Sequence, residues 1–405
     1  MNEIDTSTLR ELAATKVSTP AVASVRDLRL DLFRGLALWL IFLDHIPSNV
    51  VSWITIRNYG FSDATEIFVF ISGYTAAFVY GRAMRERGAF IATARVWRRA
   101  WQVYVAHMFL FVIYMAEIAY VSTSFNNPLY SEEMGILDFL RQPDVTLVQA
   151  LLLKFKPANM DVLPLYVVLL FGLPPVLWLM LRSLTGALAA SALLYVVARV
   201  LDWNIAAYPN GEWVFNPFAW QLLFVFGAWC ALGGVEKSKK VLRSRTLFVL
   251  CVAYLLFAFA VTLTWYIPAL APFMPKWLAE FIYPINKTDL DVLRLLHFGA
   301  LAVITVRFVP QDWPALTSPL LRPAIICGQH SLEIFCLGVF LAFTGHFILV
   351  EISDRISMQI AISAIGIALM VAAAAMIGWY KVIEGRRPGP RAPQNLDSDL
   401  AGGEA

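Results

Sequence analysis

Long apolar stretches recur along the chain, separated by short segments rich in charge, proline and glycine. An α-helix of about 20 apolar residues crosses the hydrocarbon core of a bilayer. The pattern predicts spans near residues 31–54, 63–81, 100–121, 162–181, 184–201, 217–235, 246–267, 290–306, 323–350 and 356–381. We therefore expect an all-α, polytopic integral membrane protein with about ten transmembrane helices, whose first partner is the lipid bilayer.

The composition of the 405 residues agrees with this class, because 59% are hydrophobic and only 15% are charged. Soluble domains are typically about 45–50% apolar and about 25% charged. The 32 basic and 29 acidic residues give a net charge of +3, which is too balanced to predict nucleic-acid binding. The four cysteines lie in apolar runs without the spacing of a zinc or redox site, so we expect small buried side chains.

The basic residues are distributed unequally between the two sides that ten spans define. One side carries 22 Lys and Arg residues and the other carries 8. Cytoplasmic loops hold the excess of positive charge, so both termini are expected in the cytoplasm.

The ends of the chain differ in composition from the spans. Residues 1–25 lack the apolar core of a signal peptide and are expected to form a disordered cytoplasmic leader. Residues 383–405 are rich in proline and glycine and are expected to form a disordered cytoplasmic tail. A membrane domain over 26–382 remains, in which the stretch 136–153 has the composition of an interfacial or re-entrant helix on the outer face.

The first span contains the most unusual charges, in the sequence DLFRGLALWLIFLDHIPSNVVSWI. Arg34 and His45 are eleven residues apart, so a regular helix places them on nearly the same face and about 16 Å apart along its axis. That spacing suits a donor with an anionic head near Arg34 and a reactive end near His45, which would act as general base. Coenzyme A thioesters have this shape. Packing of His45 and snorkelling of Arg34 are the structural alternative, and Asp44 is a weaker catalytic candidate.

Polar residues gather next at the outer mouth of the second span. Asp63 and Glu66 are three residues apart and share a helix face, which makes them candidates to assist His45. Helix capping is an equal alternative for one of them. Arg57 and Asn58 precede them and are candidates for binding a substrate.

Further polar and aromatic residues stand at other outer entrances. They resemble the lining of a carbohydrate site, in which aromatic faces meet sugars and amides or carboxylates meet hydroxyls; the alternative for the aromatics is the ordinary interfacial belt. The substrate-binding candidates are Asn159, Asp161, Lys287, Asp289, His297, Trp213 and Asn216.

On the inner side, two segments are candidates for the donor site. Gln329, His330 and Glu333 begin the ninth span, where a structural buried pair is equally expected. Arg98 and Arg99 are candidate phosphate clamps, with positive-inside topology as the alternative. No histidine pair has metal-ligand spacing, so no metal is predicted.

Several blocks of the sequence resemble one family. R-x10-H in a first span is similar to the acyltransferase-3 superfamily, and LDLFRGLALWLIFLDHIPSN, RNYGFSDATEIFVFISGYTAAFVYG, FKPANMDVLPLYVVLL, NKTDLDVLRLLHF and CGQHSLEIFCLGVF resemble the OpgC family from about residue 26 to 382. The resemblance implies a bacterial inner-membrane enzyme that succinylates osmoregulated periplasmic glucans from cytoplasmic succinyl-CoA. It also matches His45 to the superfamily's essential histidine and Arg34 to its motif arginine.

The leading hypothesis is a membrane O-acyltransferase that uses acyl-CoA as a co-substrate, without a tightly bound cofactor, and a periplasmic glucan as acceptor. One of Asp63, Glu66, Asp289 or His297 would orient the base or the acceptor. A transporter or flippase would use the same intramembrane charges for alternating access. A glycosyltransferase would need a nucleotide- or lipid-phosphate sugar donor. The sequence leaves a homo-oligomer open.

Overall fold

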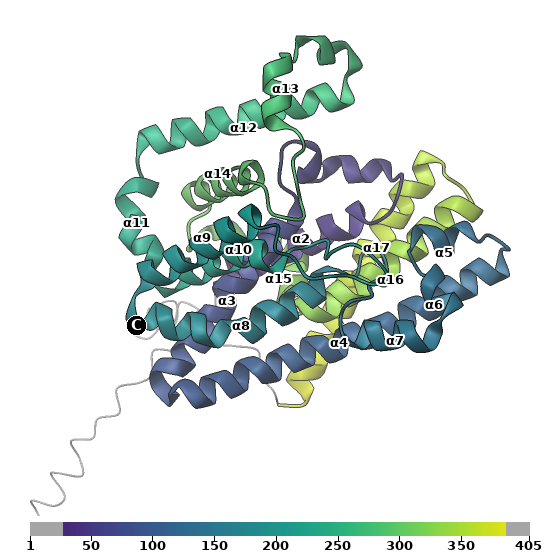
Figure 1. The fold of residues 1–405 in the computed structure, drawn as a ribbon, viewed down its shortest axis with the longest axis horizontal. Helices are drawn as coiled ribbons and strands as arrows, with labels where there is room; N and C mark the ends of the chain where they lie inside the picture. Colours follow the sequence, from purple (N-terminus) through teal and green to yellow (C-terminus); the bar gives the residue numbers. More distant parts are fainter. Residues whose placement is uncertain (1–26, 386–405) are drawn as a thin grey trace, which may run out of the picture. The chain divides into compact units, whose positions relative to one another are not determined.

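The computed structural model describes residues 27–385, so the predicted leader and residues 386–405 of the predicted tail lie outside the described part. Residues 28–377 form the larger of two compact units. The larger unit is an assembly of helices (Figure 1). Within residues 27–385 the β-pairing is limited to one isolated bridge between Ala206 and Glu212.

Each of the ten predicted spans contains a helix. Within the described residues, seven helical segments are long and apolar enough to cross a membrane. They are α3 (Ala64–Arg87), α4 (Ala89–Ser124), α8 (Val162–Arg182), the segment Pro217–Leu242, α12 (Arg245–Tyr266), α16 (Ser331–Glu351) and α17 (Ile356–Ile383). The other three predicted spans correspond to α2 (Leu28–Asp44), α9 (Leu184–Val200) and α14 (Val292–Phe308), each of 17 residues. A multi-pass membrane protein follows, and the count of ten crossings stays a prediction.

The first helix ends ten residues earlier than its apolar sequence predicts. Helix α2 stops at Asp44, and two 3-10 helices follow, η1 (Val50–Ile54) and η2 (Ile56–Asn58). Pro47 explains the end, because proline disfavours the helical conformation of the residue before it. The chain therefore turns at His45 instead of continuing to residue 54.

Two other predicted spans are interrupted. The segment predicted at 323–350 is divided at His330 into α15 (Arg322–Gln329) and α16. The segment predicted at 217–235 consists of α10 (Pro217–Trp229), a π-helical turn (η3, Cys230–Gly234) and α11 (Val235–Leu242). Gly233 has a φ of 110° in that turn, a conformation that favours glycine.

The connecting segments carry shorter helices. Where one interfacial or re-entrant helix was expected at 136–153, the structure has α6 (Leu137–Arg141) and α7 (Pro143–Leu151), because Pro143 separates them; α5 (Leu129–Glu133) precedes them. The other short helices are η4 (Pro268–Phe273), α13 (Lys276–Ile282) and η5 (Pro314–Thr317).

Glycines allow two helix pairs to approach backbone to backbone. A Cβ atom on Gly35 of α2 would collide with the carbonyl oxygen of Ala324, and one on Gly328 of α15 would collide with the carbonyl oxygen of Asp31. The pair α3–α10 repeats this arrangement through Gly73. Close approach of small residues is a common mode of helix packing in membranes. It fixes α2 and α3, which carry most of the site, against the rest of the bundle.

Candidate functional site

His45 lies in the turn that follows α2 and is half-buried. Its Nδ1 atom is 2.6 Å from the carbonyl oxygen of Ile41. Since a carbonyl only accepts hydrogen bonds, Nδ1 carries the proton, and Nε2 of the neutral ring carries the lone pair. Nε2 has no hydrogen-bond partner within residues 27–385. The local backbone thus presents an imidazole whose available nitrogen can accept a proton.

The sequence predicts that Asp63, Glu66, Asp289 or His297 orients the base or the acceptor, and this stays a prediction. In the structure, the His45 ring is oriented by the backbone carbonyl of Ile41, because the helix ends just where His45 can reach back one turn.

Asp44 fixes the loop that leads away from His45. Its Oδ1 atom accepts a hydrogen bond from the Thr55 hydroxyl at 2.7 Å and lies 3.9 Å from the Arg57 guanidinium. Asn58 donates to the carbonyl oxygen of Ser52 and accepts a hydrogen bond from the Tyr266 hydroxyl. Asp44, Arg57 and Asn58 therefore hold η1 and η2 in place beside the imidazole.

Two acids and two bases form a connected network at the start of α3. Asp63 caps the helix, and the Glu66 carboxylate closes the capping box by accepting from the Asp63 amide at 2.9 Å. Arg294 Nε donates to Glu66 at 2.8 Å and Arg294 Nη2 donates to Asp63 at 3.1 Å. Lys287 Nζ donates to Asp63 at 2.6 Å. The predicted pair Asp63 and Glu66 shares one face, and both acids are neutralised by cations more than 220 residues away in sequence.

His297 follows Arg294 by one turn of α14. The Ser62 amide donates to His297 Nδ1 at 3.3 Å, and the Ser62 hydroxyl lies 2.7 Å from the same nitrogen. Gly60 packs directly against the other side of the ring, where any side chain would collide with Nε2. These contacts hold His297 in the wall of the site.

The loop that carries Lys287 is held by amide and indole groups. Asn216, the N-cap of α10, donates to Asp289 at 2.8 Å, and Asn286 donates to the other Asp289 oxygen at 2.7 Å. The Trp220 indole donates to the carbonyl oxygens of Lys287 and Thr288. Asn216 and Asp289 therefore position the Lys287 backbone.

Trp213 is buried, with 3% of its surface exposed, which leaves no face for a sugar ring. The Lys156 ammonium group lies 4.1 Å from the centre of its ring. Burial lowers the pKa of Lys156 to about 8, although the nearby Asp161 opposes this shift. Burial likewise raises the pKa of Asp161 to about 6, against the effects of Lys156 and Lys287. Asn159 lies between the two in a left-handed conformation, with a φ of 69°.

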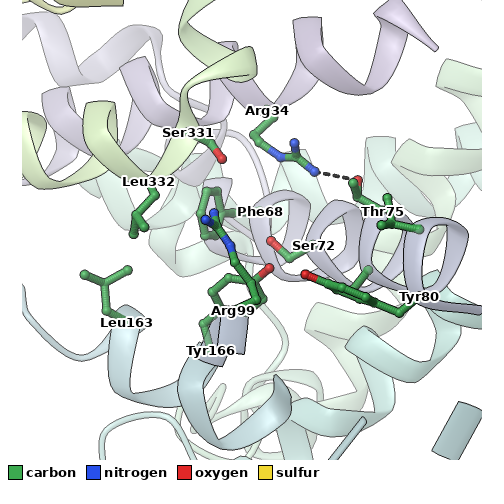
Figure 2. A pocket seen from close by; sticks show the side chains of 12 residues that line it. Arg34, Phe68, Ser72, Thr75, Tyr80, Arg99, Leu163, Tyr166, Ser331 and Leu332 are labelled. Carbon is green, nitrogen blue, oxygen red and sulfur yellow. Dashed lines mark hydrogen bonds between the residues drawn. The ribbon is translucent and has the colours of Figure 1, made fainter. Parts of the chain in front are cut away.

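A second cluster of polar side chains surrounds Arg34, near the N-terminal end of α2. A cavity of about 130 Å³ contains the side chains of Arg34 and Arg99, which point into it from α2 and α4 (Figure 2). Arg34 donates to the Thr75 hydroxyl at 2.6 Å and to the Ile71 carbonyl at 3.3 Å. The remaining lining residues are Phe68, Ser72, Ala76, Val79, Tyr80, Leu163, Tyr166, Ser331 and Leu332. Two guanidinium groups and several hydroxyls without a lining carboxylate suit an anion.

The other residues predicted for this side lie around the cavity. Arg98 is exposed and is not among the lining residues, whereas its neighbour Arg99 is. Gln329 and the buried His330 lie at the break between α15 and α16, next to the lining residues Ser331 and Leu332, and Glu333 is exposed.

The sequence reading missed the hydroxyl groups of this cavity. Ser72, Thr75 and Tyr80 of α3 stand at positions i, i+3 and i+8, which share one helix face. Polar groups on one face of an otherwise apolar span were the available signal. Tyr166 and Ser331 come from α8 and α16 and carried no comparable pattern.

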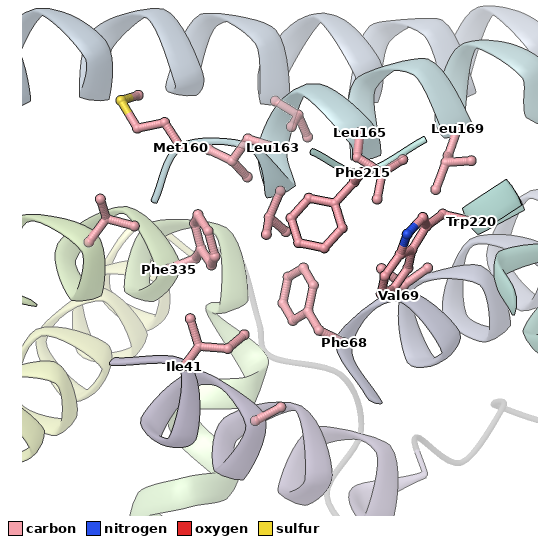
Figure 3. Close-up of a cluster of buried hydrophobic side chains, with 14 of the residues drawn as sticks. Ile41, Phe68, Val69, Met160, Leu163, Leu165, Leu169, Phe215, Trp220 and Phe335 are labelled. Atoms are coloured by element: carbon pink, nitrogen blue, oxygen red, sulfur yellow. The ribbon is translucent and has the colours of Figure 1, made fainter. Parts of the chain in front are cut away.

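A layer of apolar side chains lies between the two polar regions along α2, from Arg34 to His45, and along α3, from Glu66 to Ser72. Ile41, Phe68, Leu163 and Phe335 are buried side chains of this layer (Figure 3). Phe68 and Leu163 also line the cavity, and Phe68 lies two residues beyond Glu66 on α3. The two polar regions are therefore neighbours along α2 and α3 with apolar side chains between them.

Two further polar residues lie on α4. Glu117 accepts a hydrogen bond from the Thr344 hydroxyl at 2.6 Å. His107 is buried, and neither ring nitrogen has a hydrogen-bond partner in the described chain.

These features define a class, a polytopic helical membrane protein with a histidine site and an arginine-lined cavity along one helix. Residues 26–382 match the family described as OpgC protein, and the chain belongs to the OpgC family. Membership of this family indicates an acyl or succinyl transferase. No curated protein and no solved structure shows significant similarity to the chain. The wider acyltransferase-3 assignment stays a prediction.

Proposed function

We propose that the protein transfers a succinyl group from succinyl-CoA to a hydroxyl group of a periplasmic glucan. Membership of the OpgC family supports the reaction class. The observation that carries the mechanism is the spacing along α2, where a two-arginine cavity and a histidine with an available Nε2 are eleven residues apart. About 16 Å separates them along the helix axis, and the extended pantetheine arm of CoA is of comparable length.

In this mechanism the CoA diphosphate binds Arg34 and Arg99, and the thioester reaches His45. Nε2 of His45 removes the proton from the acceptor hydroxyl as its oxygen bonds to the thioester carbonyl carbon. The tetrahedral intermediate then releases the CoA thiolate, which takes the proton from the imidazolium. The products are a succinyl ester and CoA, and the imidazole returns to its neutral form.

The apolar layer must move for this path to open. The cavity of about 130 Å³ can hold a diphosphate but not the whole donor. Phe68 and Leu163 line the cavity and also belong to the apolar layer. Arrival of the donor is therefore proposed to displace these two side chains.

The proposed orientation places the Arg34 side in the cytoplasm and the His45 side toward the periplasm of a bacterial inner membrane. It rests on the 22 to 8 distribution of basic residues. Donor and acceptor then enter from opposite sides.

Replacement of His45 by Asn and by Ala tests the base. Asn keeps an amide where Nδ1 donates to Ile41, but it lacks a basic nitrogen. Mass spectrometry of glucans from cells should show succinyl substitution reduced about 100-fold or more in both variants, because general base catalysis contributes about 10²–10⁴. Normal protein levels and melting temperature in His45→Asn would exclude misfolding, and unchanged glucan substitution would contradict the mechanism.

Substitution of Arg34 on α2 and of the adjacent Arg98 and Arg99 on α4 tests the donor site. Arg99→Gln and Arg34→Gln should weaken binding of succinyl-CoA to the purified protein, whereas Arg98→Gln, whose side chain is exposed, should leave it unchanged. Equal effects of Arg98→Gln and Arg99→Gln would show that general positive charge, and not the cavity, attracts the donor.

A transporter without transfer chemistry is the alternative function. Such a protein would keep its substrate flux in His45→Asn.

A further inference from the structure

A second, larger cavity lies away from both polar sites. It is a groove of about 520 Å³ between α9 and α10 on one side and α12 and α14 on the other. Its walls are formed by Leu188, Ala192, Leu222, Phe226, Leu247, Leu250, Cys251, Tyr254, Leu295, Leu296, Phe298, Gly299, Ala300 and Val303. The volume is in the range of pockets that bind small molecules.

The walls of the groove are almost entirely apolar. The Tyr254 hydroxyl is directed away from it, to the carbonyl oxygen of Leu293 at 2.9 Å. Cys251 is the other lining side chain with a heteroatom, and a buried thiol behaves as a small apolar group. An alkyl chain is the ligand chemistry that such walls accept.

Helix α12 forms the outer wall and is weakly covered by the rest of the protein. It lies at the edge of the helix assembly, with α14 between it and α9 and α10 (Figure 1). Its most apolar stretch is 22% buried, the lowest value among the seven candidate spans of the described residues. In a bilayer, a groove bounded by such a helix would be close to the surrounding hydrocarbon.

One end of the groove is strongly basic. Leu247 and Leu250 lie in the first two turns of α12, which begins at Arg245. Arg307, in the last turn of α14, donates to the carbonyl oxygens of Arg243 and Ser244 and so lies at the same end. Arg243, Arg245 and Arg307 are exposed, and none of them forms an ion pair within residues 27–385. Basic groups beside an intramembrane groove fit a lipid phosphate.

We propose that this groove binds one anionic phospholipid of the surrounding bilayer, with an acyl chain between α10 and α14 and its phosphate at Arg243, Arg245 and Arg307. The bound chain would also support the His45 site. Phe226 and Phe298 line the groove, and the rings of both pack against Phe70 of α3, with centroids 5.6 Å and 5.2 Å away. The opposite face of α14 carries Arg294 and His297.

Two glycines provide a matched test of the chain-binding part. A Cβ atom on Gly299, inside the groove, or on Gly172 of α8, outside it, meets no atom within 4 Å. Gly299→Leu fills the groove and Gly172→Leu does not, and both replacements favour the helix. Delipidated protein in detergent is titrated with phosphatidylglycerol and, separately, with phosphatidylethanolamine, and bound lipid is counted by native mass spectrometry.

Wild-type protein and Gly172→Leu should each bind one phosphatidylglycerol. Gly299→Leu should bind it at least about tenfold less tightly, because each methylene excluded from the groove removes about 0.8 kcal/mol of binding free energy. Arg307→Gln and Arg243→Gln should each weaken phosphatidylglycerol about fivefold and phosphatidylethanolamine less, because the ammonium group of phosphatidylethanolamine offsets the attraction of its phosphate to arginine. Equal binding by the two leucine variants would overturn the proposal. A dimer that Gly299→Leu abolishes would overturn it too, in favour of a second copy of the chain in the groove.

Discussion

Glu66 and Arg294 bring opposite charges into the interior from distant parts of the sequence. Glu66 is fully buried, and Arg294 is 8% exposed. Burial of such ions is unfavourable unless each finds a partner, and the cost rises sharply when only one member is removed. The Glu66 carboxylate has a second structural role, because it also accepts a hydrogen bond from the Asp63 amide in the capping box.

This double role predicts an asymmetric pair of mutants. Arg294→Met should lower the free energy of unfolding by about 3–5 kcal/mol, because it leaves the Glu66 charge without a cation. Adding Glu66→Gln should recover more than half of that loss, since the amide oxygen of glutamine still closes the capping box. Thermal unfolding in detergent measures both. A double mutant whose loss equals the sum of the single losses would show that the two side chains do not interact.

The pKa of Asp161, raised by burial from its ordinary value to about 6, makes stability depend on pH. The folded protein holds this proton more tightly than the unfolded chain, so the stabilising contribution is complete below pH 4 and is lost as pH rises through 6. The melting temperature of Asp161→Asn minus that of the wild type should therefore increase between pH 4 and 6 and become constant above pH 7. A difference that falls over this range would reverse the assigned shift.

At the residue scale, the sequence predicted which polar residues share a helix face, but not which distant residues contact them. The shared face of Asp63 and Glu66 follows from local helix geometry and could be predicted. Their contacts with Lys287 and Arg294 depend on how α14 packs against α3, which no local pattern encodes. The burial of Trp213 also depends on tertiary packing. An aromatic side chain suits a sugar site, but the ring of Trp213 is buried.

Helices α2 and α15 illustrate how elements are fixed. Gly35 and Gly328 allow their backbones to meet, and the pair holds Arg34 next to the cavity formed with α3 and α4. Packing of this kind cannot relax by moving a side chain, because the atoms that would collide belong to the backbone.

A single methyl group should therefore disturb this pair. Gly328→Ala should lower the free energy of unfolding by about 1–3 kcal/mol, the usual effect of overpacking. Gly299→Ala is the control, because its Cβ meets no atom within 4 Å and alanine favours a helix. Chemical denaturation in mixed micelles compares the two. Equal stability of both variants would mean that α2 and α15 can separate without cost.

Element ends were the least predictable feature of the fold. The apolar residues after Asp44 continue the hydropathy of the first span, yet the backbone turns there. The break at His330 was also not predicted, although the polar residues Gln329 and Ser331 flank it inside the predicted span. Hydropathy reports the lipid environment of a segment, whereas these ends are decided by proline and by tertiary contacts.

At the scale of the whole molecule, the apolar layer around Phe68 divides the polar interior into two regions. Phe68→Ala should connect them. In a background without native cysteines, Ser72→Cys should react with a membrane-impermeant thiol reagent from one face of oriented vesicles only. With Phe68→Ala it should react from both faces. Labelling from both faces before Phe68 is changed would show that the layer is already open.

This layer has a consequence for the cell that contains the protein. A membrane protein with ionisable groups at two depths offers a short route for protons, and each elementary charge that crosses gains about 2.3 kcal/mol per 100 mV of membrane potential. Ile41, Phe68, Leu163 and Phe335 have no ionisable group, so while they stay packed together they would interrupt such a route. The same side chains that delay entry of a donor would therefore preserve the energy stored across the membrane between reaction cycles.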